Sequence, residues 1–175
     1  MKWKVLAVDD DLTLLPLYKA FLKFEHDVIT AECGHDALEL CKAGEYPDLI
    51  IIDHNMPVKG RDIPEWDGLE TVKYISEYYR REFKRERVDR TPKFIMCSGE
   101  GILYLKDLLK DMNEELAENE KIRIDDYLKK PFSFNELLDR IDMLLPKMSS
   151  PPPIPPSQVP PSRAPPPNNV GDSYA

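Results

Sequence analysis

The stretch Leu49-Ile50-Ile51-Ile52-Asp53 sets four large apolar residues directly before a carboxylate. A short apolar run that does not alternate with polar residues is typical of a strand buried on both faces. Such strands occur in parallel sheets that carry helices on both sides. Similar runs occur at Trp3–Val8, His26–Ala31, Lys93–Ser98 and 124–128.

Segments of helical period separate these runs. Apolar residues recur every three or four positions after each of them, as Leu15, Tyr18 and Leu22 do after the first. We expect helices beginning near residue 12, over 34–43, from residue 69, over 102–116 and over 137–145. Strands that alternate with helices predict an α/β fold with a doubly wound, five-stranded parallel sheet.

The composition changes near Pro146. From 151 to 167, 10 of 17 residues are proline, which favours polyproline II and leaves too little apolar bulk for a core. We therefore predict one domain over 1–147 and a disordered proline-rich tail over 148–175. Two interpretations of the tail stay open, a spacer and a ligand for an aromatic-lined groove.

Charge and patterning exclude several classes of function. A net charge of −8 makes nucleic acid a poor direct partner. Without a stretch of about 20 apolar residues we expect no membrane insertion, and without a signal-peptide pattern we expect a cytoplasmic protein. The scattered Cys33, Cys41 and Cys97 indicate neither a disulfide framework nor a zinc site.

Five polar residues stand at or just beyond the carboxyl ends of the expected strands: Asp9, Asp10, Asp53, Ser98 and Lys130. These ends meet at one edge of a parallel sheet, where ligands bind in open α/β folds. An acidic pair after a strand is also typical of a helix N-cap, a role that we assign to Asp11.

Three clustered carboxylates would repel one another unless a cation neutralised them. All-oxygen ligation of this kind suits Mg²⁺, with Mn²⁺ as an alternative. A carboxylate can attack phosphorus as a nucleophile and form an aspartyl phosphate. Lys130 would then pair with the phosphoryl charge, and the Ser98 hydroxyl would donate a hydrogen bond to it.

These residues belong to a string of short motifs, one beyond each of four strands and one before the third helix: Val-Asp-Asp at 8–10, Asp-His-Asn-Met-Pro at 53–57, Asp-Gly-Leu-Glu at 67–70, Ser-Gly-Glu at 98–100 and Lys-Lys-Pro-Phe at 129–132. In combination the string resembles the response-regulator receiver domains of two-component signalling, over roughly 2–147. The resemblance implies a flavodoxin-like sheet of strand order 2-1-3-4-5.

The resemblance also implies a role for each residue of the site. Asp53 would be the phosphoacceptor and a metal ligand, Asp10 would bind the metal directly, and Asp9 would bind it through water. The backbone carbonyl of Asn55 would be a further ligand. Lys130, rather than its neighbour Lys129, would pair with the phosphoryl group.

Other implied roles concern switching and the lifetime of the phosphoryl group. Ser98 would move toward the phosphoryl group while the ring of Tyr127 swings inward, although ordinary packing is the alternative for Tyr127. Asn55 and Glu100 would tune how water reaches the acyl phosphate. The bond from Lys130 to the proline that follows it would be cis, as in the family.

The sequence departs from the family pattern in two segments. Nine residues, Val58–Trp66, stand where the family usually has a much shorter connection. Arg61 and Trp66 could contact a phosphodonor there, or the segment is a plain surface insertion. The stretch from Ser98 to Lys130 is also longer than usual, which lengthens the fourth helix or the loop that follows it.

We therefore expect a phosphorylation-dependent switch, phosphorylated by a histidine kinase or a histidine phosphotransfer protein. With no effector domain apparent, its output would come through contacts with an unknown downstream protein. It would be no enzyme beyond assisting its own phosphorylation and dephosphorylation. The alternatives are a constitutive receiver-like adaptor that uses the insertion and the tail, and a Mg²⁺-dependent phosphohydrolase.

Overall fold

Five parallel strands form the centre of the protein. The computed structural model describes residues 2–57, 66–84 and 90–145. The strands are β1 (Trp3–Val8), β2 (His26–Ala31), β3 (Leu49–Asp53), β4 (Lys93–Ser98) and β5 (Asp126–Lys129). Their order is β2-β1-β3-β4-β5, so the predicted flavodoxin-like sheet is confirmed.

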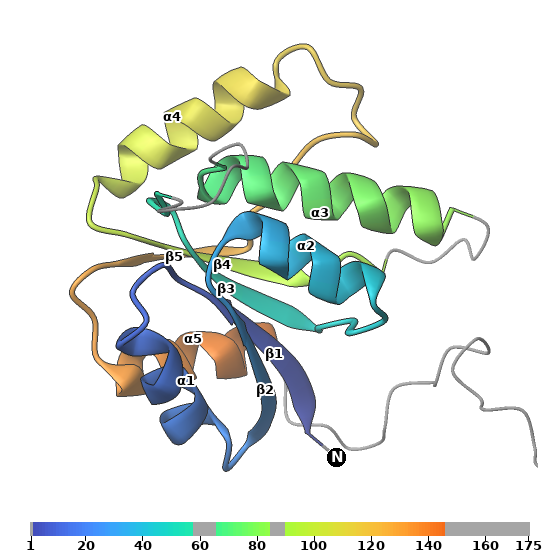
Figure 1. Ribbon diagram of the computed structural model, residues 1–175. Helices are drawn as coiled ribbons and strands as arrows, with labels where there is room; N and C mark the ends of the chain where they lie inside the picture. Colours follow the sequence, from blue (N-terminus) through green and yellow to red (C-terminus); the bar gives the residue numbers. More distant parts are fainter. Residues whose placement is uncertain (1, 58–65, 85–89, 146–175) are drawn as a thin grey trace, which may run out of the picture.

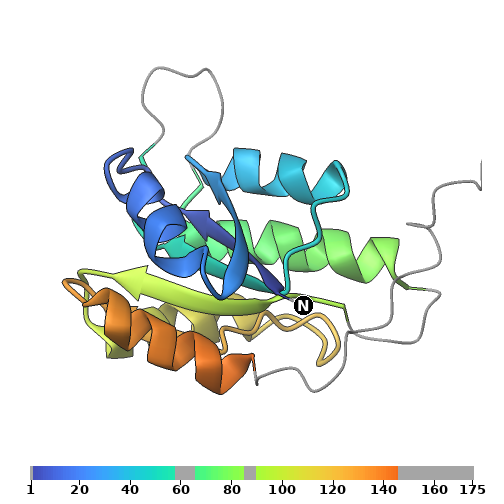
Figure 2. The ribbon, with the colours of Figure 1, turned by 90° about the horizontal axis from the view of Figure 1, so that it is seen from below.

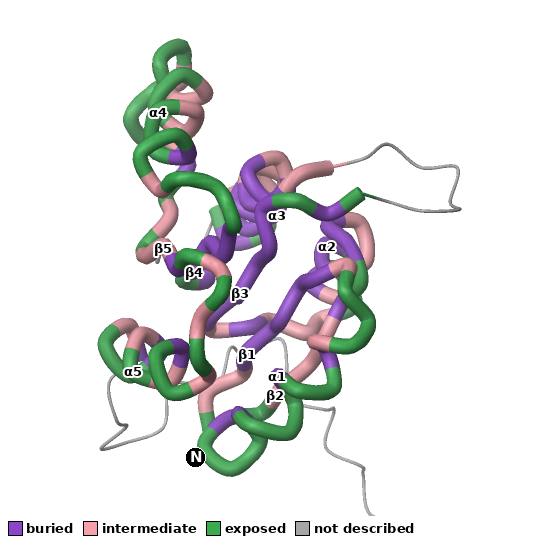
Figure 3. Tube along the Cα trace, turned by 90° about the vertical axis from the view of Figure 1, so that its left-hand side faces the viewer, coloured by how far each residue is buried: buried purple, intermediate pink, exposed green. Residues whose placement is uncertain are grey.

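Five helices cover the two faces of this sheet (Figures 1 and 2). One face carries α1 (Leu14–Leu22) and α5 (Phe134–Leu144), and the other carries α2 (Gly34–Lys42), α3 (Gly68–Glu82) and α4 (Ile102–Asn113). The inner strands are buried along their length, whereas the outer surfaces of α1, α4 and α5 face solvent (Figure 3). The predicted alternation of strands and helices is confirmed.

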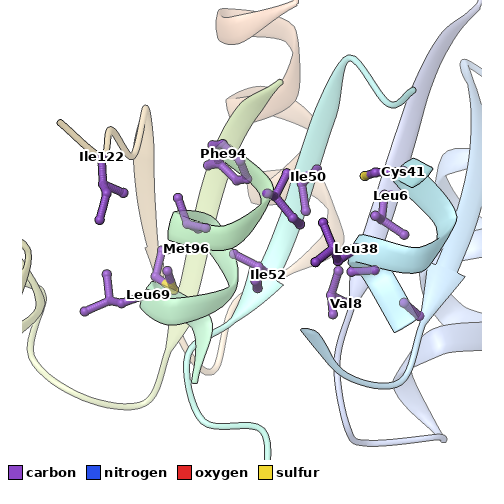
Figure 4. Close-up of a cluster of buried hydrophobic side chains, with 14 of the residues drawn as sticks. Leu6, Val8, Leu38, Cys41, Ile50, Ile52, Leu69, Phe94, Met96 and Ile122 are labelled. Carbon is purple, nitrogen blue, oxygen red and sulfur yellow. The ribbon is translucent and has the colours of Figure 1, made fainter. Parts of the chain in front are cut away.

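Strand β3 contributes to the hydrophobic core on both sides of the sheet, and all five of its residues are buried. Ile50 and Ile52 pack with Leu6 and Val8 beneath α2 and α3 (Figure 4). The alternate side chains of β3 pack on the opposite face, beneath α1 and α5. Burial on both faces is why the run lacks polar alternation, because each such side chain stabilises the fold by about 1.5–3 kcal/mol.

Two predicted boundaries were wrong because side chains bind the backbone locally. Helix α1 begins at Leu14 with Thr13 as its N-cap, whereas the sequence predicts Asp11 in that position. The Asp11 carboxylate instead accepts hydrogen bonds from the backbone N–H and the hydroxyl of Thr13, at 2.9 and 2.7 Å. Strand β5 begins at Asp126 rather than at 124, since the carboxylate of Asp125 accepts a hydrogen bond from the Phe94 N–H at 2.9 Å.

Helix α4 ends earlier than predicted, at Asn113 rather than at 116. The Asn113 side chain donates to the carbonyl of Ile122 at 2.9 Å and accepts from its N–H at 2.8 Å. This pair of hydrogen bonds fixes the connection between α4 and β5 to the end of the helix. The stretch from Ser98 to Lys130 thus contains α4, this connection and β5.

Several predictions fall on residues outside the described part of the chain. The proline-rich tail lies there, as do residues 58–65 of the insertion, including Arg61. Within the described residues, the three cysteines are buried and unbridged, as expected. No described helix combines the length and the apolar character needed to span a bilayer.

Helix α3 begins in close contact with the end of β3. The Asp67 carboxylate accepts a hydrogen bond from the Glu70 N–H at 2.8 Å, and the Glu70 side chain accepts one from the Asp67 N–H, forming a capping box. The next residue, Gly68, donates its N–H to the carbonyl of His54 at 2.8 Å. A Cβ atom at Gly68 would lie only 2.7 Å from the Asp53 carbonyl oxygen.

We predict that Gly68→Ala destabilises the protein by about 1–3 kcal/mol, because the added methyl group forces backbone atoms apart. Equilibrium denaturation in urea measures the change. Gly99→Ala is the matched control, since a Cβ atom there meets nothing within 4 Å. Equal stability of the Gly68→Ala protein and the control would contradict the close packing of α3 on β3.

Candidate functional site

The carboxyl ends of four strands bring the predicted polar residues to one edge of the sheet. Asp9 and Asp10 follow β1, Asp53 ends β3, Ser98 ends β4, and Lys130 follows β5. Parallel pairing of β1 with β3, of β3 with β4 and of β4 with β5 aligns these ends. The predicted convergence of these side chains depends on this alignment.

Three carboxylates form a cluster at this edge. Asp9, Asp10 and Asp53 each offer an oxygen, and these oxygens lie within 4.8 Å of one another. Asp9 is 1% exposed and Asp53 8% exposed, so water screens their charges poorly. An all-oxygen donor set of this kind fits a hard divalent cation such as Mg²⁺.

The ammonium group of Lys130 is the cation beside this cluster. Its Nζ lies 3.0 Å from Oδ2 of Asp9 and 3.0 Å from Oδ1 of Asp53. Burial alone would lower the pKa of Lys130, but the hydrogen bond to Asp9 and the charge of Asp53 outweigh it and raise the pKa. Lys130 therefore stays protonated, as a group that pairs with anions must.

The pKa of the Asp53 carboxyl is raised above its ordinary value. Burial raises the pKa of its carboxyl, the ammonium of Lys130 opposes this, and the charges of Asp9 and Asp10 add to it. One ammonium thus does not fully compensate the cluster. A further cation, or a proton, would relieve the remaining repulsion.

The backbone around Lys130 fixes which of the two adjacent lysines faces the cluster. The bond between Lys130 and Pro131 is cis, as predicted. The Lys130 N–H donates to the carbonyl of Ser98 at 2.8 Å. The side chain of Lys129 is exposed, as expected for the lysine outside the site.

Ser98 and Glu100 lie beside the cluster. Ser98 is buried, and its Oγ accepts a hydrogen bond from the Glu100 N–H at 2.9 Å, which leaves the hydroxyl proton available as a donor. Oε2 of Glu100 lies 3.7 Å from Nε2 of His54, a buried side chain directly after Asp53. The sequence predicts no role for His54, and only its position beside Asp53 could have indicated one.

Asn55 and Tyr127 are uncharged, unlike the carboxylates and Lys130 of the cluster. Asn55 is exposed two residues beyond the end of β3. Tyr127 is half-buried on β5, pairs with Met96 of β4, and has the ammonium of Lys106 5.5 Å from its ring centroid. Burial raises the pKa of the Tyr127 hydroxyl, which stays protonated.

Trp66, at the end of the insertion, packs between two other rings. Its ring centroid lies 3.5 Å from that of His35 on α2 and 4.2 Å from that of Tyr74 on α3, with both pairs stacked. Each aromatic pair of this kind contributes about 0.5–1.5 kcal/mol. Of the two residues that we named in the insertion, Trp66 thus attaches the segment to the α2–α3 layer.

Comparison with known proteins agrees with this geometry. Residues 5–142 match the response regulator receiver domain family. The chain is 32% identical over 149 residues to the transcriptional regulatory protein CpxR homolog of Haemophilus influenzae, covering 85% of this chain and 52% of that protein. It is 33% identical over 143 residues to CpxR of Escherichia coli K12, covering 81% and 49%. The chain spans about half the length of the curated relatives it matches.

A solved structure supports the same family membership. The chemotaxis response regulator CheY4 of Vibrio cholerae superimposes with a TM-score of 0.58 and 28% identity, covering 83% of this chain and all of that one. Receiver domains typically bind Mg²⁺ in an acidic pocket, and the carboxylate cluster here could hold such an ion. The chain belongs to the response-regulator receiver domains, the phosphorylation-based switches of two-component signalling.

Proposed function

We propose that Asp53 accepts a phosphoryl group from a phosphohistidine of a histidine kinase or a histidine phosphotransfer protein. One observation carries the proposal: the Lys130 ammonium lies 3.0 Å from Oδ1 of Asp53, inside a cluster of three carboxylates. A carboxylate held beside a cation is a nucleophile whose anionic product would be stabilised in place.

The transfer replaces one bond to phosphorus with another. An Oδ atom of Asp53 bonds to phosphorus, and the bond from phosphorus to the donor imidazole nitrogen breaks, with its electron pair remaining on that nitrogen. Lys130 pairs with a phosphoryl oxygen, and the Ser98 hydroxyl donates a hydrogen bond to another. The protein thereby assists its own phosphorylation, and it needs no separate catalytic centre.

Asp10, Asp53 and the backbone carbonyl of Asn55 would hold Mg²⁺, or Mn²⁺ in its place, and Asp9 would bind it through water. When bound, the ion supplies positive charge against the developing phosphoryl charge. The raised pKa of Asp53 supports this assignment, because burial and the neighbouring carboxylates together outweigh the single ammonium of Lys130.

The output of the switch would be a change in protein contacts. Ser98 would move toward the phosphoryl group and Tyr127 would turn inward, altering the surface formed by α4, β5 and α5. The ammonium of Lys106, which faces the Tyr127 ring at 5.5 Å, would be displaced in the same step. Asn55 and Glu100, both exposed polar residues at the rim, would control access of water and allow self-hydrolysis.

We predict that acetyl phosphate with Mg²⁺ adds one phosphoryl group to the protein, measured as intact mass. Asp53→Asn should abolish the mass increase, because an amide is no nucleophile toward phosphorus. Asp48→Asn is the matched control, a partly buried carboxyl before β3 that should leave the reaction intact. An unchanged mass in wild type, or equal labelling of the Asp53→Asn protein, would contradict the proposal.

The alternative of a constitutive adaptor makes a different prediction. Partner capture would then be the same for wild type and Asp53→Ala, with or without acetyl phosphate. A chain truncated after residue 147 would lose capture instead. Pull-downs with these proteins distinguish the two functions.

We predict that Mg²⁺ raises the melting temperature of wild type but not of Asp53→Asn. The pKa of Asp53 is higher in the folded protein than its unfolded value of about 3.9. Its protonated form therefore favours the folded state, and this stabilisation, complete below the unfolded pKa, is lost as pH rises through the folded pKa. In metal-free buffer, Asp53→Asn should therefore be the more stable protein at neutral pH, and the difference should shrink toward about pH 4.

Thermal unfolding followed by circular dichroism measures both effects. Asp48→Asn again serves as the control, because Asp48 also has a pKa raised by burial but lies away from the cluster, hydrogen-bonded to the Lys4 N–H at 2.8 Å. It should keep the full response to Mg²⁺. The proposed metal site fails if Asp53→Asn keeps that response as well.

A further inference from the structure

A basic hollow lies at the opposite end of α3 from Asp53. One cavity of about 370 Å³ and a second of about 490 Å³ adjoin each other and share Arg80, Lys84 and Asn119 as lining residues. They lie between the C-terminal end of α3 and the connection from α4 to β5, which passes this helix (Figure 1). At 1.5 Å per residue, Arg80 is about 18 Å along α3 from Gly68, so the hollow is separate from the carboxylate cluster.

The charge of this hollow contrasts with that of the whole chain. Its described lining residues include seven cations and three glutamates, in a protein whose net charge is −8. Lys73 and Arg80 are seven residues apart on α3, which places them on one face, and Lys84 follows two residues beyond the end of the helix. The hollow is therefore a concentration of positive charge on an otherwise acidic molecule.

Part of this positive charge has no ion-pair partner among the residues that the structure describes. Two of the glutamates are already paired, Glu118 with Lys121 at 2.6 Å and Glu77 with Arg81 at 3.7 Å. Among residues 2–57, 66–84 and 90–145, no carboxylate forms an ion pair with Arg80, Lys84 or Arg123. An anionic ligand would supply the missing partners.

The walls of the first cavity suit a compact ligand. Tyr79 and Phe83, both buried, give it an apolar floor, and the guanidinium of Arg90 lies 5.5 Å from the centroid of the Phe83 ring. Asn119 and Ser76 add side chains that can donate hydrogen bonds. Small-molecule sites are typically cavities of about 300–1,000 Å³, and each of these two cavities falls in that range.

The wall opposite α3 is held in place by the end of α4. The two hydrogen bonds between Asn113 and Ile122, at 2.9 and 2.8 Å, close the segment that carries Glu118, Asn119 and Lys121. This segment lies within the stretch from Ser98 to Lys130, which we expect from the sequence to be longer than in the family. The hollow is thus lined by this segment and by residues of α3 and beyond, and not by the residues of the phosphorylation motif.

We propose that this hollow binds a small polyphosphorylated anion, such as a triphosphate chain, free or as part of a nucleotide. Guanidinium groups pair with phosphate oxygens in two-point contacts, and several cations around one cavity match an anion that carries several charges. Nucleic acid is disfavoured as the occupant, because its length would bring further phosphates against the acidic remainder of the surface.

Isothermal titration calorimetry with sodium tripolyphosphate in metal-free buffer tests the proposal. Wild type should bind one equivalent, and Arg80→Gln, Lys84→Gln and Arg123→Gln combined should weaken binding about tenfold or more. Lys19→Gln, Lys23→Gln and Lys110→Gln combined remove the same charge from exposed sites outside the hollow and should leave binding unchanged. Binding should also weaken as salt is added.

Absence of binding by wild type, or an equal loss in the control protein, would overturn the proposal. NMR provides the location: the side-chain amide of Asn119 should shift on titration, and shifts confined to Asp53 and Lys130 would count against the hollow. Orthophosphate binding as tightly as tripolyphosphate would also overturn it. Adenosine and guanosine triphosphates, titrated in parallel, identify the source, since tighter binding than tripolyphosphate means that the nucleoside also contacts the hollow.

Discussion

One ammonium group shared by two buried carboxylates holds the functional edge of the sheet together. Lys130 reaches Asp9, which is 121 residues away in the chain, and Asp53, with both contacts at 3.0 Å. Charges so far from water are tolerated only when an opposite charge lies beside them, and removing the one ammonium that two carboxylates share would typically cost about 3–5 kcal/mol. The ends of β1, β3 and β5 must therefore meet for any one of these residues to be accommodated.

The excess of negative charge that remains links the stability of the domain to its chemistry. Burial holds the pKa of Asp53 above its ordinary value even with Lys130 beside it. The metal-free edge is thus strained electrostatically, and neutralisation by a cation acts in the same direction as protonation. A group placed to accept a phosphoryl group is also a group that destabilises the empty site.

Much of the fold could be predicted because its strands are buried on both faces. The apolar runs fixed the bounds of β1, β2 and β4 and the strand order followed from the family resemblance. The start of β5 and the N-cap of α1 could not be predicted, because Asp125 and Thr13 act through hydrogen bonds to particular backbone or side-chain groups. Such contacts cannot be predicted from hydrophobic periodicity.

The candidate site could likewise be predicted only in part. Asp9, Asp10, Asp53 and Lys130 could be placed together because parallel strands end at a common edge. The contact of His54 with Glu100 could not, because it depends on how the two side chains turn beyond β3 and β4, and the basic hollow could not, because it depends on the path of the connection from α4 to β5. 

The three-ring stack at Trp66 has a consequence for how this domain can diversify. Met56 is buried in the core, and Trp66 is held between His35 and Tyr74 ten positions later, so described residues attach both ends of the intervening segment to the folded layer. The entropy of closing a loop between fixed points rises only slowly, by about 0.6 kcal/mol for each doubling of length. Insertions and deletions between those points therefore cost little stability. Related chains can vary the length of this segment while the carboxylate cluster stays unchanged.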